Sequence, residues 1–134
     1  MSKKYEAMVL SCIDPRFQKP IHKHLKDKKL TGKFSAFTIA GGSIGVTNNK
    51  FKKWHSTFWE NLETSINLHK INKLIVINHK DCGAAKIAHN NKNFNSSIEN
   101  SIHKKSFSKL KKTLKKKFPN IKVTFKILSI KNAL

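Results

Sequence analysis

The sequence has 134 residues, of which 38% are hydrophobic, and its 28 Lys and Arg against 7 Asp and Glu give a formal net charge of +21. A chain of this length can bury one hydrophobic core, so we expect residues 1–134 to form a single domain. The hydrophobic fraction argues against disorder, and because no apolar run approaches the roughly 20 residues of a membrane span, we expect a soluble protein.

Two strands are predicted in the first part of the chain. Residues 7–12 (AMVLSC) form a short apolar run that ends before an Asp-Pro pair, which is typical of a buried strand entering a turn. Residues 34–39 (FSAFTI) form a second run, which a Gly-Gly pair ends shortly afterwards. The stretch between them (KPIHKHLKDKKLTG) has few apolar residues and is either a short helix or a loop that closes at Gly32.

The rest of the chain alternates helical and extended patterns. An amphipathic helix is predicted from Phe51 to about His69, because apolar residues recur at intervals of three and four: Trp54, Phe58, Leu62 and Ile66. Residues 73–79 (KLIVINH) form a continuous apolar run, typical of a strand covered on both faces.

An Asn-rich loop is predicted over residues 90–97. A second amphipathic helix follows and is stopped by a Pro-Asn pair; its apolar face contains Phe107, Leu110, Leu114 and Phe118. Residues 121–128 (IKVTFKIL) alternate in character, as an edge strand would.

Strands separated by helices predict an α/β protein, a three-layer fold with a mostly parallel central sheet of about four strands flanked by helices. Sites in such sheets form beyond the carboxyl ends of the strands. Cys12 ends the first predicted strand, and His79 and Cys82 follow the third. We therefore expect two thiols and one imidazole to meet at one edge of the sheet.

Cys12, His79 and Cys82 form a donor set that suits zinc, and three protein ligands leave a fourth position for water or substrate, as in catalytic sites. The alternative is that the cysteines are merely buried and the histidine merely hydrogen-bonded. The remaining histidines are interpreted as surface residues, apart from any that lines the cleft: His22, His24, His55, His69, His89 and His103.

The segment CIDPR adds Asp14 and Arg16 at alternating positions after Cys12. A carboxylate and a guanidinium can form paired charge-assisted hydrogen bonds, which keep the carboxylate ionised and able only to accept. Such an acceptor could orient a hydroxide beside the metal. Arg16 is the only arginine in the sequence, and the alternative is an Asp-Pro turn followed by an exposed arginine.

These motifs resemble those of the β-class carbonic anhydrases, which have a C-x-D-x-R segment followed later by H-x-x-C-G. Here the segments are CIDPR (residues 12–16) and HKDCG (residues 79–83). A strand that ends in Ala40-Gly41 lies between them, and the predicted crossover helix precedes the second motif. The resemblance covers about residues 7–88, and the two motifs together are specific.

The resemblance implies a zinc ion held by Cys12, His79 and Cys82, with Asp14 and Arg16 beside it as the catalytic pair. It also implies reversible hydration of carbon dioxide to bicarbonate and a proton, in a homodimer or a multiple of dimers. Asp14 would accept a hydrogen bond from the nucleophilic hydroxide. In some members this aspartate moves onto the metal and closes the site, which would give Asp14 a second role.

The chain departs from the family pattern in two places. Family members commonly have a longer N-terminal helical arm that embraces the partner subunit, with a glutamine near the substrate, whereas eleven residues precede Cys12 here. Many also have Arg-Asn before the Ala-Gly pair, where this chain has Thr38-Ile39. The dimer interface and the substrate pocket are therefore expected to depart from the pattern more than the zinc site.

Two other functions fit the same residues. One is a related zinc hydrolase of another small linear molecule, carbonyl sulfide or carbon disulfide, because specificity depends on cleft residues, for which Phe17, Ser43 and Ile44 are candidates. The other is a non-catalytic zinc-binding or nucleic-acid-binding basic protein. Lys supplies 27 of the 28 basic residues and is scattered along the chain, and no nucleic-acid module is recognised, so nucleic-acid binding is not favoured.

The N-terminal segment predicts no export signal. Its apolar part has about six residues and runs into Asp14 and Arg16, so it is too short for a signal-peptide core. Two cysteines without a sign of secretion favour thiols or metal ligands over a disulfide. We therefore expect a cytoplasmic protein with no membrane partner.

Overall fold

The computed structural model describes residues 4–90 and 93–129. Within these ranges the chain forms one sheet of four strands: β1 (Ala7–Ser11), β2 (Phe34–Thr38), β3 (Lys73–His79) and β4 (Lys122–Leu128). The strand order is β2-β1-β3-β4, and all three pairings are parallel. The predicted α/β class with a parallel central sheet is confirmed, and so is the position of β4 at an edge.

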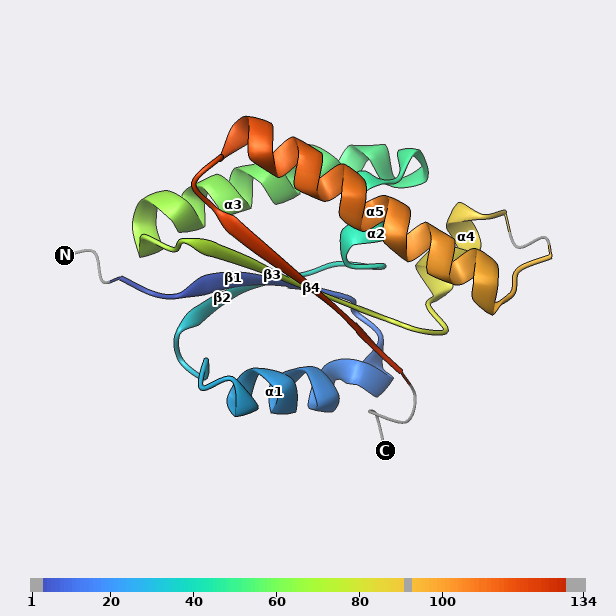
Figure 1. Ribbon diagram of the computed structural model, residues 1–134, viewed down its shortest axis with the longest axis horizontal. Coiled ribbons are helices and arrows are strands. Elements are labelled where there is room, and N and C mark those ends of the chain that lie inside the picture. Colours follow the sequence, from blue (N-terminus) through green and yellow to red (C-terminus); the bar gives the residue numbers. More distant parts are fainter. Residues whose placement is uncertain (1–3, 91–92, 130–134) are drawn as a thin grey trace.

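Helical segments connect the strands: η1 (Pro15–Phe17), α1 (Gln18–Asp27), α2 (Ser43–Thr47), η2 (Asn49–Trp54), α3 (His55–His69), α4 (Gly83–Ala88) and α5 (Ser96–Lys117). Helix α1 covers one face of the sheet, and α2, α3 and α5 lie on the other (Figure 1), which gives three layers. In the described ranges, no helix has both the length and the apolar character needed to cross a membrane.

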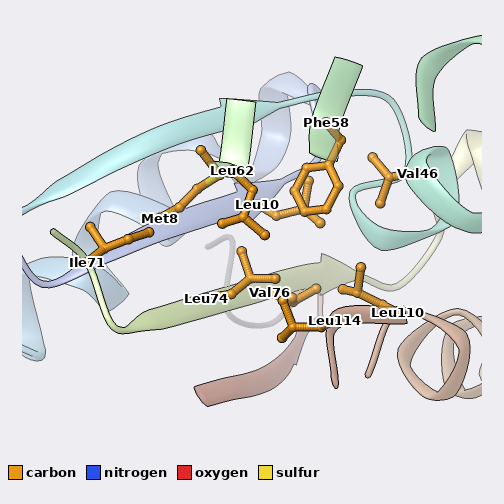
Figure 2. Packing of buried hydrophobic residues seen from close by; sticks show 10 residues of the cluster. All are labelled: Met8, Leu10, Val46, Phe58, Leu62, Ile71, Leu74, Val76, Leu110 and Leu114. Atoms are coloured by element: carbon orange, nitrogen blue, oxygen red, sulfur yellow. The ribbon is translucent and has the colours of Figure 1, made fainter. Parts of the chain in front are cut away.

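Alternation along the strands divides the hydrophobic core between the two faces of the sheet. Figure 2 shows the larger part, where side chains of β1 and β3 meet those of α2, α3 and α5; its members include Met8, Leu10, Val46, Phe58, Leu62, Leu74, Val76, Leu110 and Leu114. The other face packs against α1 through Ala7, Val9, Ile21, Leu25, Ile75 and Ile77. Strand β3 is therefore buried on both faces, which explains its continuous apolar run.

The stretch between β1 and β2 is helical, which is one of the two predicted alternatives, because Ile21 and Leu25 give α1 a buried side. Other elements differ from the prediction. The helix predicted from Phe51 is interrupted, since Phe51 has non-helical angles and the regular helix α3 begins at His55. Helix α2 was not predicted, because five residues are too few to produce a periodic pattern. Residues 91–92 of the predicted Asn-rich loop lie outside the described residues.

Helix α5 begins well before the apolar residues that predicted it, because Asn95 caps its first turn. The Asn95 side chain accepts a hydrogen bond of 2.9 Å from the backbone N–H of Ile98. We expect Asn95→Ala to lower the free energy of unfolding by about 1 kcal/mol, the usual cost of losing such a cap. Urea denaturation measures this, with the exposed Ser97→Ala in the same turn as the control. Equal stability of the two variants would contradict the capping role.

Candidate metal centre

The parallel pairing of β1 with β3 brings the predicted metal ligands together. Ser11 is in register with Ile77, so Cys12, which follows β1, and His79, which ends β3, lie at the same edge of the sheet. Cys82 reaches this edge as the N-cap residue of α4. All three are buried, and their donor atoms lie within 4.8 Å of one another.

The His79 ring is oriented so that one nitrogen faces the thiols. Its Nδ1–H donates to the carbonyl oxygen of Lys80 at 2.8 Å, and its ring stacks on Phe17 with 4.2 Å between centroids. Among the described residues, Nε2 of His79 is the one buried side-chain nitrogen or oxygen without a hydrogen-bond partner. Because it has no such partner, Nε2 is available to a ligand. A buried polar atom left unsatisfied costs about 1–3 kcal/mol, and a bound ligand would remove this cost.

Cys12 and Cys82 are free cysteines, and a hydrogen bond links their sulfur atoms. The hydrogen bond from Cys82 lowers the pKa of Cys12 although burial opposes it, and the backbone N–H of Gly41 donates to the same sulfur at 3.2 Å. The proton that Cys82 donates to Cys12, together with burial, raises the pKa of Cys82. Burial alone would lower the pKa of His79, but its contact with Cys12 and its bond to Lys80 raise it.

These residues fit a zinc ion. Two sulfurs and one imidazole nitrogen are donors that zinc prefers, and donors around a tetrahedral zinc lie roughly 3.8 Å apart, which is within the observed span. The bond from Nδ1 of His79 to a backbone carbonyl is also the usual second contact of a metal-binding histidine. A bound cation would give Nε2 of His79 a partner and would also balance the negative charge on the Cys12 sulfur.

Asp14 and Arg16 form the predicted pair, directly beside the thiols and the imidazole. The Arg16 guanidinium donates to both oxygens of Asp14, from Nη2 to Oδ2 at 2.8 Å and from Nε to Oδ1 at 3.2 Å. These bonds lower the pKa of Asp14. Oδ2 of Asp14 lies 3.7 Å from Nε2 of His79, so an ionised acceptor borders the group of donor atoms.

Asp81 is a second partner of Arg16 that the sequence prediction missed. Arg16 donates from Nη1 to Oδ2 of Asp81 at 3.0 Å, and from Nη2 to the backbone oxygen of Asp81 at 3.0 Å. The guanidinium therefore ties the segment after β1 to the segment after β3. The sequence offered one indication that Asp81 belongs to the site, because it lies inside the HKDCG motif and directly before Cys82.

A cavity of about 380 Å³ opens beside Cys12 and Asp14. Its wall is mostly apolar and includes Ile13, Phe51, Trp54 and Ile87, with the Phe51 and Trp54 rings stacked 4.8 Å apart. The candidate cleft residues Phe17, Ser43 and Ile44 are not among the residues that line it. That expectation was wrong, because Phe17 and Ile44 pack into the hydrophobic core and Ser43 forms buried hydrogen bonds.

The interpretation of His103 as a surface residue was also wrong. It is 0% exposed and lies in α5 one turn after Glu99, which is 5% exposed, and burial lowers the pKa of His103. The other five histidines range from half-buried to exposed. An indication was present in the sequence, because Glu99, His103 and Ser106 continue the stripe of Leu110 and Leu114 at intervals of three and four.

Comparison with solved structures supports the fold. A carbonic anhydrase from Glaciozyma antarctica matches with a TM-score of 0.62 at 16% identity, over 99% of this chain and 81% of that one. The β-carbonic anhydrase of Aspergillus fumigatus matches with a TM-score of 0.62 at 12% identity, over 98% and 74%. A structure described as one of two tetrameric β-carbonic anhydrases from Sordaria macrospora matches with a TM-score of 0.62 at 9% identity, over 98% of this chain and 79% of that one. At these identities the likeness establishes the fold alone.

Sequence comparison identifies the family. Two uncharacterized proteins, from Rickettsia conorii and Rickettsia bellii, are each 29% identical to this chain over 117 residues, or 87% of its length. The chain spans 63% of the first relative and 71% of the second. The family model described as "Putative carbonic anhydrase" matches residues 1–127. With nearly its whole length matched by this model, the chain belongs to that carbonic anhydrase family and has the fold of the β-class enzymes.

Proposed function

We propose that the chain is a zinc-dependent carbonic anhydrase that catalyses the reversible hydration of carbon dioxide to bicarbonate and a proton. The observation that carries this proposal is the orphaned, buried Nε2 of His79, which lies with two thiols and beside the ionised carboxylate of Asp14. Cys12, His79 and Cys82 would hold the metal. When bound, zinc supplies a Lewis acid that makes hydroxide available near neutral pH.

Asp14 and Arg16 have separate roles in this proposal. Arg16 keeps Asp14 ionised and fixes its two oxygens through paired hydrogen bonds. An ionised carboxylate accepts hydrogen bonds and cannot donate them, so Asp14 would hold the hydrogen of the attacking hydroxide and turn its lone pair toward carbon dioxide. Asp81 supports this arrangement through its contacts with Arg16.

The cavity beside Asp14 suits a small, uncharged substrate. Its wall is mostly apolar and offers few polar partners that could retain water, so carbon dioxide can approach without displacing strongly bound solvent. The product bicarbonate is charged and is poorly matched to the same wall. Entry of carbon dioxide into the cavity and departure of the anion to solvent are therefore both favoured.

We expect Asp14→Asn to lower the rate of carbon dioxide hydration by about 100-fold, the lower end of the effect of a positioned proton-handling group. Zinc content should be unchanged, because Asp14 lies outside the proposed ligand set. Stopped-flow hydration assays on the zinc-loaded chain measure the rate. Asp27→Asn is the matched control, since Asp27 also forms a 2.9 Å ion pair but with Lys23 on the exposed side of α1.

The outcomes separate the parts of the proposal. Normal turnover by Asp14→Asn would remove the Asp14 and Arg16 pair from the mechanism. A parent chain with bound zinc and no hydration activity would contradict the proposed reaction. Because an apolar cavity also accepts other small linear molecules, the same assay with carbonyl sulfide and carbon disulfide tests the alternative hydrolase.

We also propose a single domain over residues 1–134 that assembles as a homodimer or a higher oligomer in the cytoplasm. Ile13 and Ile87, 58% and 51% exposed, flank the cavity and would be protected by a second subunit. A similar structure is described as tetrameric. The two free thiols suit a reducing compartment.

A further inference from the structure

Glu99 is a buried carboxylate that holds the backbone between His79 and Cys82. It is 5% exposed, and each of its oxygens accepts a hydrogen bond from one of two consecutive backbone amides. Oε1 accepts from the N–H of Asp81 at 3.0 Å, and Oε2 accepts from the N–H of Cys82 at 2.9 Å. The carboxylate therefore binds the segment from which the Cys82 sulfur projects.

The backbone conformation of this segment needs support. Asp81 has φ +59°, in the left-handed region that few residues other than glycine adopt. Such a conformation is unfavourable for a residue with a side chain and persists only where surrounding contacts determine it. Two groups supply those contacts. Glu99 accepts hydrogen bonds from the backbone amides of Asp81 and Cys82, and Arg16 donates to Asp81.

His103 supplies a third hydrogen bond to Glu99, and its tautomer follows from its neighbours. Oδ1 of Asn78 accepts from the backbone N–H of Ser43 at 3.1 Å, so the Asn78 amide nitrogen faces Nδ1 of His103 at 2.9 Å. Nδ1 must therefore accept, which places the His103 proton on Nε2. Nε2 then donates to Oε2 of Glu99 at 3.3 Å.

The hydrogen-bond network of Glu99, His103 and Asn78 also anchors α5 to α2 and β3. The Asn78 amide also donates to Oγ of Ser43 at 2.8 Å. Oγ of Ser43 donates in turn to Oγ of Ser106 at 2.7 Å, and Ser106 donates to the carbonyl oxygen of His103. Because each donor has an acceptor, the network fixes the position of Glu99 before any ligand binds.

We infer that Glu99 is a positioning residue for the metal centre, which presets the backbone of Asp81 and Cys82 so that the Cys82 sulfur meets Cys12 and His79. The inference rests on the zinc site of the proposed function. Its physical basis is preorganisation: outer contacts that orient a ligand typically contribute 10- to 100-fold to metal affinity. The negative charge of Glu99 also becomes easier to bury once a cation is bound nearby.

The test is Glu99→Gln in the full chain. A glutamine amide places an NH₂ group against one of the two backbone N–H donors, so one bond becomes a donor–donor contact. We expect zinc affinity, measured by competition with a chromophoric chelator, to fall about 10- to 100-fold. In the metal-free chain, the amides of Asp81 and Cys82 should exchange hydrogen faster. Glu63→Gln, an exposed substitution of the same kind on α3, should change neither measurement.

Glu99→Asp keeps the charge but shortens the side chain by one methylene, so it can reach only one amide. It should give an intermediate loss of zinc affinity, and it takes the place of Glu99→Gln if that variant does not fold. The absorption bands of the cobalt-substituted chain provide a further measurement. They should shift in both Glu99 variants, because a displaced sulfur alters the metal's ligand field, whereas a role in stability alone would leave them unchanged.

Zinc affinity within twofold of the parent in both Glu99 variants, with unchanged amide exchange, would overturn the inference. These measurements do not use carbon dioxide. A parent that binds zinc but does not hydrate carbon dioxide would therefore overturn the proposed reaction, while a weakened Glu99→Gln in the same experiment would still support the positioning role. A parent that binds no zinc would overturn both.

Discussion

Replacement of His79 by glutamine is expected to abolish zinc binding and carbon dioxide hydration together. The substitution removes Nε2, the buried nitrogen that faces the two thiols, and replaces it with an amide, which is a poor zinc ligand. The loss of zinc affinity should exceed the roughly 10- to 100-fold typical of an outer contact. Metal content after dialysis and the hydration rate measure the two effects.

His22→Gln is the matched control, because His22 is exposed on α1 and belongs to neither motif. It should retain the parent's zinc content and hydration rate. Circular dichroism on the His79 variant would show whether the helices and strands remain. A folded His79→Gln chain with the parent's zinc content would contradict the assignment of this histidine as a ligand.

Gly42→Ala is expected to lower the free energy of unfolding by about 3 kcal/mol, from backbone strain and overpacking together. Gly42 precedes α2 with φ +56° and ψ −118°, angles that a residue with a Cβ rarely adopts. A Cβ there would also lie 2.6 Å from Oδ1 of Asn78, which accepts from the N–H of Ser43. The substitution therefore strains the backbone and disturbs the buried network at once.

Gly83→Ala is the control for this prediction. An added Cβ at Gly83 meets nothing within 4 Å, and Gly83 begins α4 without a positive φ. Its stability should stay within about 0.5 kcal/mol of the parent, as for most substitutions at open positions. Urea denaturation of the metal-free chains compares the two, and equal stability would contradict the steric requirement at Gly42.

The grouping of Cys12, His79 and Cys82 could be predicted because it depends on few non-local details. Each lies at or just after the carboxyl end of a strand with a continuous apolar run, and parallel strands carry their carboxyl ends to one edge of a sheet. The sequence therefore indicated the meeting point without specifying any helix position. The pair of Asp14 and Arg16 was predictable for a similar reason, because two residues of separation keep their contact local.

The buried network was not predicted because polar residues were interpreted by their type. Glu99 and His103 are charged or ionisable and would ordinarily be exposed, yet they continue the buried stripe of α5. Their burial is stable because the backbone amides of Asp81 and Cys82 and the Asn78 side chain satisfy their polar atoms. No local pattern in α5 identifies those distant partners.

The sequence by itself determined the strands, the α/β class with its parallel sheet and the residues that meet at the sheet edge, because hydrophobic periodicity and strand direction act over short stretches. Only the tertiary structure decided that Glu99 supports the Cys82 backbone, that Asp81 shares Arg16, and which residues line the cavity. Those contacts depend on how far α4 and α5 are rotated and shifted against the sheet. The packing of surfaces distant in sequence sets that placement.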